Sequence, residues 1–106
     1  MEKELMQAIM GLITYGGNAK SECMESIQLA KEGKFNEAYQ KIEAANESLV
    51  EAHHSQTALL TQEARGEKVE VSLLLIHAQD HLMNAITFRD LAKEMIALYE
   101  RIEDKH

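Results

Sequence analysis

The sequence contains no proline, no tryptophan and only one cysteine among its 106 residues. Proline is a strong helix breaker, so its absence permits long, uninterrupted helices. A single cysteine, Cys23, cannot form a disulfide within the chain, which fits a reducing compartment. We interpret Cys23 as a small core residue and expect one domain with one core over residues 1–106.

Basic runs and long apolar runs are also missing. The formal net charge is −7, and nucleic-acid binding depends largely on lysine and arginine meeting phosphate, so we expect no nucleic-acid partner. The chain begins Met1-Glu2-Lys3-Glu4, and no apolar stretch long enough for a signal peptide or a spanning helix follows. We therefore expect no direct membrane insertion and a cytoplasmic location.

The residues that dominate the chain are good helix formers: alanine, leucine, glutamate, lysine, glutamine and methionine. Gly33 and Gly66 each have the setting of a helix end followed by a short turn. The sequence thus predicts three helices, over residues 3–31, 35–64 and 68–103. Short turns make neighbouring helices antiparallel, so the predicted fold is all-α, an antiparallel three-helix up-down-up bundle.

Apolar residues recur at alternating steps of three and four along the first two predicted helices. In the second helix this seam contains one polar residue, Gln56. In the first helix the seam passes Gly16-Gly17 without losing its period, which indicates close packing of another helix there rather than a break.

The third predicted helix is apolar nearly all round from Val71 to Ile86. In a monomeric bundle a helix keeps a polar outward face, and this half-helix has no clear one. We therefore expect other subunits to cover it, which predicts a homo-oligomer built on the third helix.

A polar stretch with the sequence HAQDHLM, residues 77–83, lies within this apolar region. His77 is about as far after the turn at Gly66 as Gln56 is before it, so the two residues should lie at one level of an antiparallel pair. A glutamine amide can hydrogen-bond an imidazole nitrogen and fix its tautomer. We therefore expect Gln56 to contact His77.

The residues alone leave three interpretations of the histidines open. In the first, His77 and His81 are ordinary hydrogen-bonded helix residues. In the second, their spacing of four lets them chelate a transition metal with help from His53 or His54. In the third, His77 is a nucleophile that attacks phosphorus, because imidazole titrates near neutrality and forms a phosphoramidate that transfers readily.

Asp80 has two interpretations. The simpler is a solvent-exposed helix residue. If the helix packs about a symmetry axis, however, several copies of Asp80 could share one hard cation such as magnesium, which would neutralise them and join the subunits. Composition does not choose between the two.

The stretch HAQDHLM at 77–83, preceded by EAHHSQT at 51–57, resembles the enzyme IIA subunit of the lactose/cellobiose class of the bacterial phosphoenolpyruvate-dependent sugar phosphotransferase system. The resemblance covers nearly the whole chain, including Gly16-Gly17, the Gly33 turn and the closing stretch LYER at 98–101. It implies a cytoplasmic homotrimer of three-helix protomers that acts as a phosphotransferase component.

The resemblance also implies roles for individual residues. His77 would accept a phosphoryl group from HPr and pass it to a cysteine of the cognate IIB component, with Gln56 and His81 as supporting residues. Asp80 and its symmetry mates would hold one Mg²⁺ per trimer at the axis.

The membrane IIC component, rather than this subunit, would bind the sugar, a β-linked disaccharide such as cellobiose or lactose. The alternative is a non-enzymatic helical-bundle adaptor, whose polar stretch only specifies oligomer register, or a transition-metal-binding oligomer. His53 and His54 receive no role from the resemblance.

Overall fold

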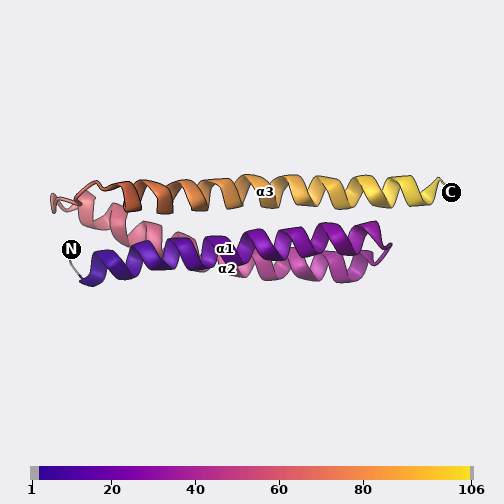
Figure 1. Ribbon diagram of the computed structural model, residues 1–106, viewed down its shortest axis with the longest axis horizontal. Coiled ribbons are helices and arrows are strands. Elements are labelled where there is room, and N and C mark those ends of the chain that lie inside the picture. Colours follow the sequence, from indigo (N-terminus) through magenta and orange to yellow (C-terminus); the bar gives the residue numbers. More distant parts are fainter. Residues whose placement is uncertain (1–2, 106) are drawn as a thin grey trace.

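The computed structural model describes residues 3–105, which form three helices: α1 (Lys3–Lys31), α2 (Phe35–Ala64) and α3 (Leu73–Asp104). The helices lie side by side along one long axis and give a rod of 58 × 21 × 17 Å (Figure 1). The α2–α3 connection lies at the end where the chain begins, and the α1–α2 turn lies toward the opposite end. The predicted all-α, up-down-up bundle is confirmed. Residues 1, 2 and 106 of the expected domain lie outside the described residues.

A glycine in the left-handed backbone region closes the turn between α1 and α2. Gly33 has φ 78°, and the N–H groups of Gly33 and Lys34 donate to the carbonyls of Ala30 and Leu29. This geometry satisfies the last carbonyls of α1 and reverses the chain within three residues, Glu32 to Lys34. The observed bounds of α1 and α2 coincide with the predicted ranges 3–31 and 35–64.

The third helix begins at Leu73, so the predicted start at residue 68 is wrong. Ser72 is the N-cap, with extended backbone angles (φ −137°, ψ 163°), and its hydroxyl accepts a hydrogen bond from the Leu75 N–H at 3.1 Å. The cap satisfies one of the free N–H groups at the helix start. The β-branched residues Val69 and Val71, just before it, suit extended backbone better than helix.

The apolar seams predicted for α1 and α2 form the core. Along α2, the buried residues are Ala38, Ile42, Ala45, Leu49, Ala52 and Leu59. The inner face of α3 buries Leu75, Ala78, Leu82, Ala85, Ala92 and Ile96. Cys23 is fully buried in the same core, as expected. No helix of the described chain, residues 3–105, has the length and apolarity needed to cross a membrane.

The interface between α2 and α3 carries three polar bridges at well-separated levels. They are Tyr39 with Glu100, Asn46 with Arg89, and Gln56 with Gln79. Each bridge has its own position along the rod, and a shift of one helix along the other would break all of them together. The bridges are therefore compatible with a single register of α3 on α2, whereas the buried core supplies most of the stability of this pairing.

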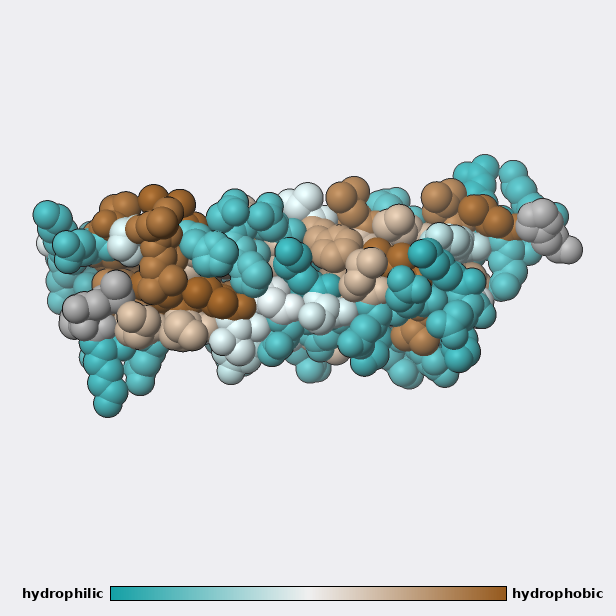
Figure 2. All heavy atoms as spheres, viewed as in Figure 1, coloured by the Kyte–Doolittle hydropathy of each residue, from teal (hydrophilic) through white to brown (hydrophobic). Residues whose placement is uncertain are grey.

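The outward face of α3 carries an exposed apolar stripe, opposite to the buried face. Its exposed fractions range from 40% to 83%, and its members are Leu73, Ile76, Met83, Leu91, Met95, Leu98 and Ile102. At 100° per residue these positions share one side of the helix, together with Asp80 and Thr87. Figure 2 shows brown side chains gathered at the end of the rod where α3 begins. The first half of α3, predicted to be apolar nearly all round, therefore exposes apolar side chains at the surface of the single chain.

Burial governs the chemistry of Cys23. Removal from water raises the pKa of the Cys23 thiol from 9.0 to about 11, a rise that the nearby positive charge of Arg89 partly opposes. We expect the native protein not to react with iodoacetamide at about pH 8, and full alkylation in denaturant. Intact mass after timed labelling measures this.

The same shift makes stability depend on pH. A folded-state pKa above the unfolded value stabilises the fold below pH 9.0, and this contribution is lost as the pH rises toward about 11. Denaturant unfolding across this window should show less loss of stability for Cys23→Ala than for the unmodified chain. Equal pH dependence of the two proteins would contradict the assignment.

Candidate functional site

His77 and His81 lie in the first turns of α3, four residues apart, and so share one side of the helix. His77 is exposed, whereas His81 is half-buried. Their rings are stacked, with centroids 5.9 Å apart and planes inclined by 29°. The pair therefore combines one ring open to a partner with one ring held against the bundle.

An apolar border surrounds the exposed ring. Leu73, Leu74 and His77 line a hollow in the surface at the start of α3. Leu73 is 83% exposed, so this border is available to a partner rather than committed to the core of the chain. In a helix the side chains point back toward the N-terminus, which explains why His77 meets residues of the preceding turn.

The half-buried ring lies against α1 at two glycines. A Cβ atom on Gly16 would come within 3.1 Å of Cδ2 of His81, and one on Gly17 within 3.4 Å of Nε2. Helix α1 continues unbroken through both residues. The expectation of close helix packing at Gly16-Gly17, rather than a break, is confirmed.

Gln56 has a different partner from the one expected. Its Nε2 donates to Oε1 of Gln79 at 2.9 Å, so the predicted hydrogen bond to His77 is not formed. Gln79 lies two residues after His77 and therefore about 200° around the helix from it. Counting residues from the turn at Gly66 placed Gln56 at nearly the right position along α3. The count gave no information about which face of α3 contacts α2. Sequence reasoning missed Gln79, although a polar residue near the level of the one polar seam position was a usable signal.

Asp80 is exposed and accepts a hydrogen bond from Nδ2 of Asn84 at 3.3 Å. Within residues 3–105, no three histidine, cysteine, aspartate or glutamate side chains come together in a way that would hold a metal ion. His53 and His54 are exposed on α2 and do not join the His77–His81 pair in such a group. One chain alone therefore builds neither the transition-metal site nor a site at Asp80.

The arrangement suits reversible attachment of a group to an imidazole nitrogen. Imidazole is nucleophilic when neutral, and the group that it accepts remains reactive. A second imidazole beside the first can carry positive charge when the attached group is an anion. His77 lies in a shallow hollow that it shares with Leu73 and Leu74, so its ring is open to a second reactant.

Comparison with known proteins gives a consistent result. The family model described as "PTS system, Lactose/Cellobiose specific IIA subunit" matches residues 7–100. The lichenan-specific phosphotransferase enzyme IIA component of Bacillus subtilis (strain 168) is 50% identical over 105 residues, covering 99% of this chain and 96% of that protein.

Two solved structures have the same fold. The crystal structure of the cellobiose-specific enzyme IIA from Bacillus anthracis has a TM-score of 0.96 and 53% identity, over 100% of this chain and 97% of that one. The solution structure of a IIA(chitobiose)–HPr complex from Escherichia coli has a TM-score of 0.82 and 38% identity, over 96% of this chain and 99% of that one.

Proposed function

This chain belongs to the lactose/cellobiose-specific IIA family of the sugar phosphotransferase system, and from that premise we propose that His77 is its phosphoryl-carrying residue. The chain is a phosphocarrier component of sugar uptake. The observation that supports His77 is its position: it is the exposed member of a stacked histidine pair, bordered by exposed leucine. His81, half-buried against α1, is less open to a donor.

The donor is HPr and the acceptor is a cysteine of the cognate IIB component, with a IIC component moving the sugar. A solved relative at 38% identity is a complex with HPr. In the accepting step a neutral nitrogen of His77 forms a bond to phosphorus while the bond between phosphorus and HPr breaks. In the second step the IIB thiolate forms the new bond to phosphorus, and His77 recovers its nitrogen lone pair.

His81 and Gln56 support this chemistry in different ways. The ring of His81, with its centroid 5.9 Å from that of His77, lies beside the ring that would carry the phosphoryl group. Gln56 acts at a distance, because its bond to Gln79 fixes the register of α3 on α2 next to the histidine pair. Both residues are supporting rather than reacting groups.

The active form is a homotrimer in which the exposed stripe of α3 from each copy packs around a common axis. A monomer would leave this apolar stripe in water along most of α3. Asp80 lies on the same side of the helix as Ile76 and Met83, so three copies of Asp80 would approach one another at the axis. Carboxylate oxygens suit a hard cation, and one Mg²⁺ per trimer would offset the repulsion of the three charges.

The whole chain, residues 1–106, is a single IIA domain that works in the cytoplasm. The sugar is a β-linked disaccharide such as cellobiose or lactose. Similar proteins are named for lichenan, cellobiose and chitobiose, so the class of sugar rather than one member is proposed.

The nucleophile is tested by incubation with phosphoenolpyruvate, enzyme I and HPr, followed by intact mass. We expect His77→Ala to fold normally, because it changes an exposed side chain, and to gain no phosphoryl group. His81→Ala should be labelled, but about tenfold more slowly, because the supporting ring is lost. Full labelling of His77→Ala would refute the assignment, and no labelling of the unmodified chain would favour the adaptor alternative.

The chemical nature of the bond gives an independent check. A phosphoramidate on imidazole hydrolyses in acid and persists in mild alkali, which is the opposite of a serine phosphate. We expect the mass increase to disappear after brief acid treatment and to survive mild alkali. A label with the reverse behaviour would exclude a histidine carrier.

The trimer is tested by light scattering with variants of the exposed stripe. We expect Ile76→Lys to dissociate the trimer and keep its helix content, because Ile76 is 55% exposed in the single chain. Asp80→Leu should remove bound metal and keep or strengthen the trimer, since an apolar side chain suits an apolar axis. Leu75 and Leu82 are unsuitable probes, because they are buried within the protomer. A monomeric unmodified chain at micromolar concentration would refute the trimer and the role of Asp80.

A further inference from the structure

We infer that Gly16 and Gly17 are positioning residues, which form a seat on α1 for the His81 ring and thereby hold the ring that supports His77. The inference rests on the proposed phosphocarrier function. It starts from an observation that this function does not explain: two adjacent glycines in the middle of a helix of 29 residues. Glycine is an unfavourable residue in a helix interior, so a side-chain-free surface at this point needs a reason.

The contacts supply that reason. A Cβ on Gly16 would lie 3.1 Å from Cδ2 of His81 and 3.7 Å from the backbone carbonyl carbon and oxygen of the same residue. A Cβ on Gly17 would lie 3.4 Å from Nε2. The two glycines therefore face one histidine, one at the carbon edge of the ring and the other at its nitrogen. Any other residue at Gly16 would separate the helices or turn the ring.

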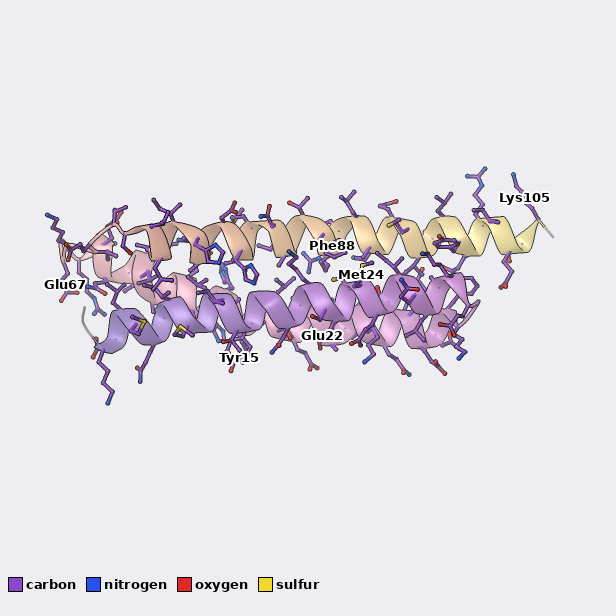
Figure 3. All side chains as sticks on the ribbon, in the orientation of Figure 1. Tyr15, Glu22, Met24, Glu67, Phe88 and Lys105 are labelled. Atoms are coloured by element: carbon purple, nitrogen blue, oxygen red, sulfur yellow. The ribbon has the colours of Figure 1, made fainter. Side chains whose placement is uncertain are left out.

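The rest of this interface is filled in the ordinary way. Figure 3 shows Met24 of α1 and Phe88 of α3 pointing toward each other between the two helices, while Tyr15 and Glu22 point away from α3. Met24 and Phe88 thus lie between the helices farther along α3, whereas α1 has two residues without side chains where His81 lies.

The seat matters for function because of what His81 stacks on. Its ring is inclined by only 29° to that of His77, at a centroid distance of 5.9 Å. An unsupported histidine on a helix surface samples several rotamers, and only some of them keep the two rings together. Contact with α1 restricts the rotamers of His81, so its ring stays beside the place where the phosphoryl group arrives.

Gly17→Ala is the variant that separates positioning from simple structure. A Cβ at 3.4 Å from Nε2 is at the edge of ordinary contact, so the methyl group can be accommodated. Alanine also favours helix more than glycine, and we expect the melting temperature at fixed protein concentration to rise by about 4 °C. The same methyl group comes into van der Waals contact with Nε2 of His81 and restricts the hydrogen bonds that this nitrogen can make, and we expect phosphoryl acceptance from HPr to slow about tenfold. If Gly17 had only a structural role, a substitution that raises stability would not also slow phosphoryl acceptance.

Two controls complete the experiment. Gly11→Ala makes the same substitution in the same helix. Its Cβ would clash with Oγ of Ser55, which has to rotate away, but it meets no histidine, so the rate should stay close to that of the unmodified chain. Gly17→Ala is also made in the His81→Ala background, where the seat has no ring to hold. There it should have no further effect on the rate, which is the non-additivity expected of residues that act through one another.

The imidazole nitrogen and Cδ2 resonances of His81 give a readout that needs no phosphorylation. We expect them to shift in Gly17→Ala, while those of His53 and His54, exposed on α2, stay unchanged. A full rate for Gly17→Ala would overturn the inference, and so would an equal fractional loss in the His81→Ala background. If the unmodified chain accepts no phosphoryl group, the proposed function fails. In that case the His81 resonances alone test the contact with the glycines, and unchanged His81 resonances in Gly17→Ala would overturn the inference.

Discussion

Helix α3 packs against α1 and α2 through one narrow face, and the rest of the molecule depends on this constraint. That face is made of alternating large and small residues, and Ala78, Ala85 and Ala92 recur at intervals of seven with no exposed surface. Small residues let the helices approach closely, so α3 is held along most of its length by a thin seam. The opposite side of the same helix carries its own apolar stripe at the same kind of spacing. A helix with two opposed seams has only its two flanks left for polar side chains.

The flanks carry the polar residues of the candidate site. His77 and His81 lie on one flank, where α1 provides the glycine contact, and Gln79 lies on the other, where it meets Gln56 of α2. Each flank is therefore tied to a different helix of the bundle. This arrangement explains how the imidazole of His77 can be exposed and yet well placed: the helix that carries it is fixed from both sides.

Sequence reasoning predicted the parts of this structure that depend on periodicity. The bounds of α1 and α2 follow from the glycine turn and the regular apolar spacing, and both are properties of neighbouring residues. The start of α3 was misplaced because the turn glycine Gly66 and the N-cap Ser72 are separate features, with an extended segment of alternating valines between them. The partner of Gln56 was misassigned for a related reason. A count of residues from a turn gives the level along the rod, but the face depends on the packing of α3 against both other helices.

The late start of α3 has a consequence for the chemistry at His77. With Ser72 as the cap, His77 is the fifth residue of the helix, and its ring lies back over the first turn beside Leu73 and Leu74. The first turn of a helix carries unpaired N–H groups and the positive end of the helix dipole, an environment that favours an added negative charge. Had α3 begun at residue 68, His77 would lie more than a turn farther from that end, beyond the range of the effect. The Ser72 cap thus does more than end a loop: it sets the distance between the His77 ring and the electropositive end of its own helix.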